Sequence, residues 1–285
     1  LMLSITDAEG DFLNYEVDIT SIKLERVGGS EVEVVPESSR IDFAQYVEMT
    51  EFFTAATLPS GHYKSVTLTL DYSNAQIKVE NAEGNAVDAT VVDENGDAIT
   101  QTEVSMSLSE SGYLRIFPGL PSFLTLDFDL ESSHIVDMTL DPVQATLDPV
   151  VVADTSLEDP KPHLLRGILK TVDTEDSTML IDLRPFRFKQ GRFGSAYALV
   201  DENTYYDING ESLTGDAGLT ALAELPVNTA ILVTGEVSIS QRQFVATHVV
   251  AGSSLPWGDR DIISGNVIAR DGEILTVRGA TVVRS

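Results

Sequence analysis

The sequence contains no cysteine, and its four histidines lie far apart. Without cysteine the chain forms no disulfide and has neither a thiol nucleophile nor a cysteine-ligated metal. The histidines form no His-Glu-x-x-His zinc motif, and the sequence has no Gly-x-Ser-x-Gly elbow, P-loop or dinucleotide-binding fingerprint. No run of about 18 apolar residues is present, so no segment matches a membrane-spanning helix. These absences predict a protein that is not an enzyme.

Basic residues are scarce as well, because 18 lysines and arginines stand against 45 acidic residues, for a formal net charge of −27. Residues 1–160 carry 6 basic and 30 acidic side chains, whereas residues 161–285 carry 12 and 15. This asymmetry indicates two domains with different surfaces. Because phosphate binding needs clustered lysine and arginine, we expect no nucleic-acid partner. The acidity is compatible with cation binding, a salt-rich environment or solubility alone.

Alternating apolar residues predict strands along the first half of the chain. Tyr15, Val17 and Ile19 share one face at a period of two, and a change of face after Thr20 predicts a bulge. Turn signals separate these short strands, and only residues 43–53 fit either a short helix or an irregular turn. We therefore expect residues 1–152 to form an acidic antiparallel β-sandwich.

A second domain is predicted after a boundary at residues 153–162. This stretch is polar and ends in two prolines, which is typical of a linker. Residues 163–252 then show three strand patterns, one short helix with an apolar stripe over residues 216–225, and two final strands. This order predicts a small β-barrel of the OB type. The fold class expected for the whole chain is therefore all-β.

A weak internal repeat follows the barrel. Residues 165–169 are similar to residues 263–267, and each segment carries a glycine inside its strand, Gly167 and Gly265. Glycine at such a position marks a bulge or a bend that curls a barrel. We expect residues 259–285 to be a partial second barrel repeat. An incomplete repeat leaves an unpaired edge, so we expect the native protein to continue beyond Ser285.

Three segments of the first half resemble a known family: residues 3–8, 56–63 and 68–71. The second of them contains the pattern Leu-Pro-x-Gly-x-Tyr just before a predicted strand. They are similar to bacterial envelope proteins catalogued as domain of unknown function 4382, and the resemblance covers roughly residues 1–155.

Residues 163–252 resemble a second family, catalogued as domain of unknown function 5666. The similarity rests on the hairpin at Gly167, the strand at Thr204 and residues 233–237, and it resumes after Asp261. The two resemblances imply a predicted lipoprotein of the Gram-negative cell envelope, in the periplasm or at the outer membrane and cell surface. They carry over no catalytic or binding residues. Because the lipid-bearing cysteine is missing, we expect a trimmed start, with membrane contact only through a lost anchor and its removed signal peptide.

Two acidic turns are candidate calcium sites. One contains Asp93, Asn95 and Asp97, and the other contains Asp7 and Asp11. Carboxylate and amide oxygens are the ligands that calcium prefers. However, Gly96 stands at the fourth position of the first loop, where an EF-hand has its glycine at the sixth. The alternative is that both are simple exposed turns, so we expect no cofactor other than a possible calcium ion.

Residues 184–193 form the one local positive cluster, in which four cations interleave with three aromatic rings. The candidate ligand-binding side chains are those of Arg184, Phe186, Arg187, Phe188, Lys189 and Arg192. They would suit an anionic glycan or a lipid headgroup, or a contact with the acidic first domain. Trp257, the single tryptophan, is either a sugar platform or a linker anchor.

Our leading interpretation is a non-enzymatic envelope protein that acts as a binding or spacer module. Its partners are unknown, and an anionic glycan or another envelope component is the expected class. One alternative is an accessory domain of a carbohydrate-active enzyme. Another is a structural surface-assembly subunit that uses its strand edges.

Overall fold

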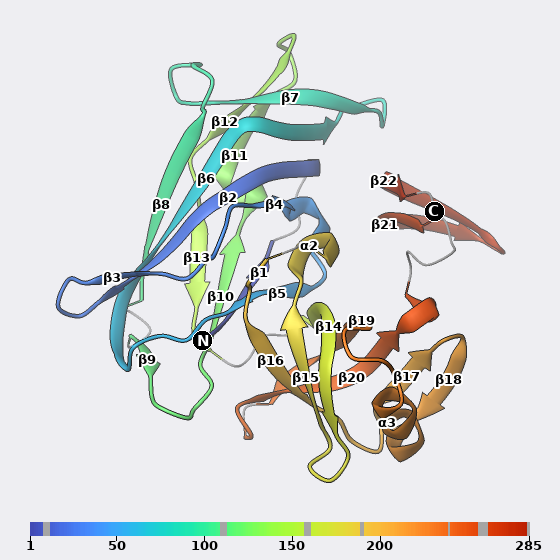
Figure 1. Cartoon of the computed structure of the whole chain (residues 1–285). Helices are drawn as coiled ribbons and strands as arrows, with labels where there is room; N and C mark the ends of the chain where they lie inside the picture. The colour runs from blue at the N-terminus through green and yellow to red at the C-terminus, as the bar shows by residue number, and fades with distance from the viewer. Residues whose placement is uncertain are drawn as a thin grey trace.

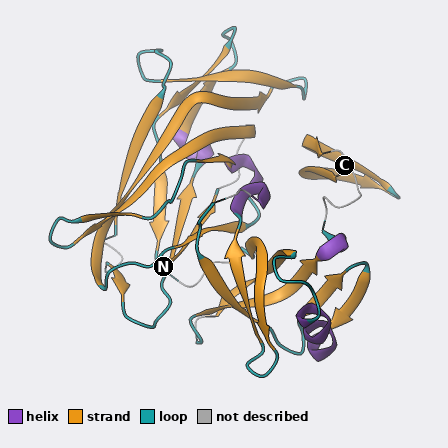
Figure 2. Cartoon of the chain, in the orientation of Figure 1, coloured by secondary structure: helices purple, strands orange, loops and turns teal. Residues whose placement is uncertain are grey.

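The computed structural model describes residues 1–7, 12–108, 113–156, 161–188, 191–238, 240–255 and 262–283. Strands make up 59% of the chain and helices 8%, which confirms the predicted all-β class (Figure 2). No helix in the described residues is long and apolar enough to cross a membrane. The described strands form two large sheets and one separate hairpin (Figure 1).

The first sheet lies within the N-terminal half and is built around two long antiparallel strands, β2 (Phe12–Arg26) and β6 (Gly61–Glu80). The predicted face of Tyr15, Val17 and Ile19 is fully buried, and the register of β2 shifts after Ile19, as the change of face predicted. The other strands of this sheet are β3 (Glu31–Glu33), β4 (Ser39–Asp42), β7 (Ala86–Val92), β8 (Gln101–Ser107), β9 (Leu114–Ile116), β11 (His134–Asp137) and β12 (Val143–Leu147).

The second sheet runs through both halves of the chain (Figure 1). Its N-terminal strands are β1 (Met2–Thr6), β5 (Thr50–Ala55), β10 (Phe123–Phe128) and β13 (Val151–Asp154). The inner faces of the two sheets share one core, where Tyr15 of β2 meets Phe128 of β10 with ring centroids 5.8 Å apart. β5 then pairs in parallel with β14 (His163–Asp173), so the sheet continues without a break into the C-terminal half.

Five C-terminal strands close into a barrel. In spatial order they are β14, β15 (Thr178–Leu183), β16 (Ser195–Leu199), β20 (Gln243–Ala251) and β19 (Ala230–Ser238), which pairs back with β14. Every pair is antiparallel except β16 with β20. The helix α3 (Gly215–Ala223) and the strand β17 (Tyr205–Ile208) lie where the sequence predicts them. β18 (Glu211–Thr214), the hairpin partner of β17, was not predicted.

Gly167 is needed for close approach of two strands. A Cβ atom at this position would lie 2.3 Å from the carbonyl oxygen of Asp182, which is closer than any real contact. The register shift of β14 lies between Leu169 and Thr171, so the bulge is displaced from the predicted glycine. The glycine therefore serves the tight curvature of the barrel rather than the bulge itself.

The C-terminal repeat forms the predicted hairpin, β21 (Ile262–Asp271) with β22 (Ile274–Val283). Its register shifts between Ser264 and Asn266, on either side of Gly265, in agreement with the predicted bulge. Within the described residues this hairpin forms a sheet of its own. Whether it begins a second barrel remains a prediction.

Short helices occupy four connections: η1 (Phe43–Gln45), α1 (Leu130–Ser133), α2 (Pro185–Phe188) and η2 (Gly252–Ser254). Residues 43–53 therefore combine one 3₁₀ turn with the start of β5, and no α-helix forms there.

The predicted linker is short and held at its ends. β13 extends to Asp154 and β14 starts at His163, so ladder pairing reaches both ends of this stretch. Lys161 donates a hydrogen bond from Nζ to Oγ1 of Thr6 at 2.9 Å, and the main-chain N–H of Thr50 donates to the carbonyl oxygen of Pro162 at 3.0 Å. The described end of the linker is thereby attached to the N-terminal half.

Candidate functional site

A buried carboxylate lies at the junction of the two halves. Glu51 lies on β5, and its side chain has no exposed surface. Its Oε2 accepts the hydroxyl proton of Tyr46 at 2.6 Å, and its Oε1 accepts the main-chain N–H of Phe186 at 2.9 Å. Nε of Arg166 on β14 lies 3.1 Å from Oε1. The Glu51 carboxylate thus contacts a neutral donor from each half and one cation, Arg166, from the C-terminal half.

Aromatic rings pack around this ion pair. Phe186 of α2 lies with its ring centroid 4.9 Å from that of Phe53 on β5, and Phe193 lies 5.8 Å from Phe53. The carbonyl oxygen of Phe193 accepts hydrogen bonds from the N–H of Ala55 at 2.7 Å and the hydroxyl of Thr54 at 3.1 Å. The segment predicted as a positive cluster is therefore docked on β5.

The packing of this segment on β5 determines which of the candidate ligand-binding side chains are buried and which are exposed. Phe186 is buried against β5, and its predicted role as a ligand contact stays a prediction. Arg184 is half-buried and donates from Nη1 to the carbonyl oxygen of Leu183, whereas Arg192 is exposed. The side chains of Arg187 and Phe188, and the whole of Lys189 and Trp257, lie outside the described residues, so their predicted roles stay predictions.

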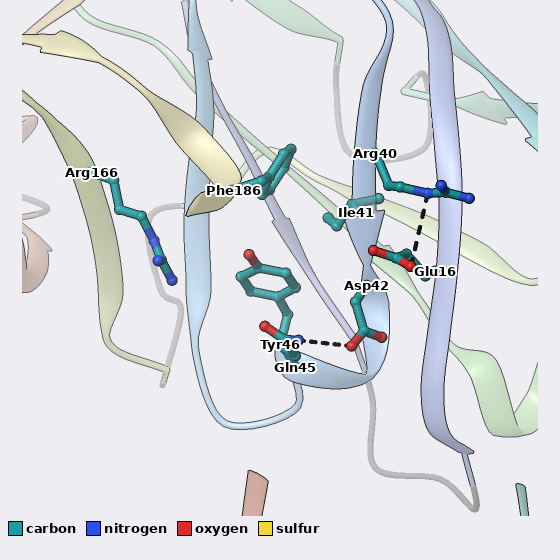
Figure 3. A pocket seen from close by; sticks show the side chains of 8 residues that line it. All are labelled: Glu16, Arg40, Ile41, Asp42, Gln45, Tyr46, Arg166 and Phe186. Atoms are coloured by element: carbon teal, nitrogen blue, oxygen red, sulfur yellow. Dashed lines mark hydrogen bonds and ion pairs between the residues drawn. The ribbon is translucent and has the colours of Figure 1, made fainter. Parts of the chain in front are cut away.

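A polar pocket of about 270 Å³ opens beside the junction (Figure 3). Its lining residues are Glu16, Arg40, Ile41, Asp42, Gln45, Tyr46, Arg166 and Phe186. Figure 3 shows Arg40 and Arg166 on opposite sides, each from a different half of the chain.

The charged groups of this pocket are engaged with one another. Arg40 lies 3.9 Å from Glu16, and Asp42 accepts hydrogen bonds from the N–H of Tyr15 and the side chain of Gln45, both at 2.8 Å. Burial raises the pKa of Asp42 despite these hydrogen bonds. With its cations already neutralised, this pocket is better suited to joining the halves than to holding an anion.

A larger groove of about 460 Å³ lies between the barrel and the N-terminal half. β16 forms one wall and runs close to the N-terminus in Figure 1. The lining residues are Leu1, Met2, Ala55, Ala56, Thr57, Pro121, Phe123, Asp176, Thr178, Ser195, Ala196, Tyr197, Leu199, Gln243 and Phe244. Among these described residues Asp176 has the only charged side chain, so the groove is largely neutral.

The calcium candidates Asp93, Asn95 and Asp97 are brought together in an exposed turn. Oδ1 of Asp93 accepts the N–H of Asn95 at 2.8 Å and that of Asp97 at 2.9 Å. The N–H of Asp97 is the main cause that holds the pKa of Asp93 below its usual range. Within the described ranges no three acidic or histidine side chains are grouped to hold a metal ion. The Asp93 carboxylate therefore closes its own turn.

Asp7 occupies a different environment from the exposed turn that the sequence predicted. Its side chain is only 1% exposed, and Oδ1 accepts the N–H of Leu130 at 3.1 Å. Its main-chain oxygen accepts a hydrogen bond from Lys161. Asp7 thus ties β1 to α1 and to the domain boundary. Asp11 lies outside the described residues.

We expect the melting temperature to be the same in calcium and in excess chelator at matched ionic strength. The reason is that a bound ion needs six to eight oxygens, whereas the Asp93 turn uses its own oxygens for main-chain hydrogen bonds. Differential scanning calorimetry measures the difference. A calcium-specific rise that magnesium does not reproduce, and that disappears in a D93N/D97N double variant, would restore the calcium hypothesis.

The buried carboxylate of the junction was not identified from the sequence. Glu51 stands in a strand between Thr50 and two phenylalanines. A lone carboxylate at such a place is a signal for a buried partner, because isolated charges are almost never buried. No local feature of the sequence identifies Arg166 as that partner.

Comparisons with known proteins bear on the N-terminal half. A search of curated proteins and a search of solved structures each returned no match. The second resemblance, over residues 163–252, stays a prediction. Residues 1–142 match the family model described as Domain of unknown function (DUF4382), which confirms the resemblance seen in the first half of the sequence.

Proposed function

We propose that this protein is a non-enzymatic binding or spacer module of the bacterial cell envelope whose two domains form one rigid unit. The observation that carries the proposal is the sheet that continues from β5 into β14, with the buried Glu51–Arg166 pair beside it. A hinge between domains would need an exposed junction with few hydrogen bonds. Here main-chain pairing, aromatic packing and a charge pair all cross the boundary.

Finer features of the fold belong to the same proposal. The first domain is a β-sandwich, supported by two sheets that share one core. The barrel is OB-like, supported by its strand order, the parallel pair of β16 with β20, and a helix between its third and fourth strands.

The placement in the envelope rests on family resemblance. The matched family model covers residues 1–142, and the resemblance of residues 163–252 to domain of unknown function 5666 points the same way. We propose a lipoprotein, with the acidic first domain as its most strongly charged part. A rigid pair of domains would hold a binding surface at a set distance from the anchor.

Pulsed electron paramagnetic resonance tests the rigid unit, because a chain without cysteine takes two spin labels without background. The labels go on E103C of β8 and E236C of β19, which are exposed strand positions in different domains. We expect one narrow distance distribution. A matched pair within the first domain, E103C with T90C, gives the width of the distance distribution expected when both labels lie in one rigid domain. A cross-domain distribution several times broader than this control would refute the proposal.

A further inference from the structure

The outer face of β16 forms one wall of the neutral groove. Ala196 and Ala198 point into the barrel and are buried, whereas Ser195 and Tyr197 alternate with them and face outward. Ala55 and Phe123 from the N-terminal half form the opposite wall. The groove exists because the continuous sheet holds β16 beside β1, β5 and β10.

Tyr197 is the most exposed aromatic residue of the groove, with 66% of its surface accessible. A ligand that covered this ring would gain free energy from its burial. Its pairing partner across the ladder is Leu180 of β15, which places the ring above the outer surface of the barrel. The ring is therefore available to a ligand.

Polar groups without internal partners line the same groove. In the described part of the chain the side chains of Thr178, Tyr197 and Gln243 make no hydrogen bond, whereas Ser195 donates to Asp182 at 2.6 Å. A hydroxyl and an amide of this kind both donate and accept. The groove thus combines one flat apolar face with several neutral hydrogen-bonding groups.

This chemistry selects a class of ligand. A sugar ring has an apolar C–H face that stacks on an aromatic ring and hydroxyls at its rim that pair with neutral polar groups. The volume of about 460 Å³ lies in the range of ligand pockets. Nucleic acid does not fit, because the lining side chains include no cation and the chain carries a net charge of −27.

We propose that the groove around Tyr197 binds a neutral polysaccharide chain. This inference rests on the proposed binding function and names its ligand class. It also gives the rigid junction a purpose, because one wall of the groove comes from each domain and the site is complete only while the domains are held together.

A neighbouring pocket defines the competing ligand. It measures about 250 Å³, shares Phe123 with the groove, and includes Arg115 and Arg242 among its lining residues. An acidic polysaccharide would use these cations instead of Tyr197. The two ligand classes therefore depend on different residues and can be separated by substitution.

Affinity electrophoresis in native gels tests the proposal with three neutral polysaccharides, dextran, laminarin and galactomannan. We expect at least one of them to retard the native protein, and Y197A to weaken that binding by about tenfold. The matched control is Y205A, which removes an exposed tyrosine of β17 outside the groove. Y205A should be retarded as strongly as the native protein, and circular dichroism should show both variants folded.

Three outcomes would overturn the inference. They are the absence of retardation by all three polysaccharides, equal retardation of native protein and Y197A, and retention on alginate alone that R242A abolishes. If the groove binds no polysaccharide but the cross-domain distance distribution is narrow, the proposal of a rigid spacer still holds. Glycan binding together with a broad distribution would refute the rigid unit instead.

Discussion

Replacing Arg166 with alanine is expected to lower the free energy of unfolding by about 3–5 kcal/mol. The variant removes the cation that lies 3.1 Å from Glu51, whose side chain has no exposed surface. A charge left unpaired in such a place cannot be solvated by water without opening the junction. Urea denaturation followed by circular dichroism measures the change.

The same strand provides a matched control. Lys170 of β14 pairs with Asp182 at 3.0 Å, but its side chain is 40% exposed. Solvent screens such a pair, so K170A should cost no more than about 1 kcal/mol. A double variant, E51L/R166M, removes both buried charges and should be more stable than R166A, because no unpaired charge remains. If R166A lost no more stability than K170A, the ion pair would not hold the junction.

Stability is expected to fall by about 3 kcal/mol between pH 6.5 and pH 4 because of a single partly buried histidine, His134. Burial lowers the pKa of His134 from 6.5 to about 4, although a hydrogen bond to Leu130 partly opposes this shift. In this window the unfolded chain binds a proton and the folded chain does not. Folding therefore becomes less favourable as the pH falls from 6.5 to 4, and the contribution is fully present above pH 6.5.

The hydrogen bonds of His134 explain why the neutral ring is preferred. Nδ1 lies 2.8 Å from the carbonyl oxygen of Leu130, which can only accept, so Nδ1 carries the proton. Nε2 then accepts from the hydroxyl of Tyr15 at 2.8 Å, and Tyr15 in turn lies 3.0 Å from the hydroxyl of Tyr72. A second proton on the ring would displace the hydrogen bond from Tyr15.

Urea titrations of H134Q at several pH values isolate this contribution. Glutamine does not titrate. The loss of stability between about pH 6.5 and about pH 4 should therefore be smaller by about 3 kcal/mol in H134Q than in the native protein. H62Q is the control, because His62 is exposed on β6. An equal pH dependence in H134Q and the native protein would rule out His134 as the cause.

Much of the secondary structure could be predicted because it depends on the spacing of apolar residues along the chain. The alternation in β2 and the bulge after Ile19 follow from a period of two and its interruption. The barrel strands and the helix α3 were predicted for the same reason. β18 was missed because residues 211–214 have no alternating apolar pattern, and its pairing with β17 comes from the turn between them.

The candidate site was harder to predict. Residues 184–193 look like an exposed positive surface when they are read alone, yet Phe186 and Phe193 are buried. Likewise Asp7 stands beside acidic neighbours in the sequence, although its carboxylate binds the N–H of a residue 123 positions away. Local composition shows which side-chain chemistry is available. It does not show which side chains are buried against a distant strand or helix.

The sequence by itself determined the all-β class, the asymmetry of charge, the exclusion of thiol chemistry and the positions of most strands. These properties depend on composition and on neighbours a few residues apart. Only the tertiary structure decided that β5 pairs with β14, that Glu51 meets Arg166, and that Tyr197 faces a groove lined by both halves of the chain. Such contacts join residues more than 100 positions apart, and their free energy depends on burial and geometry that no local pattern contains.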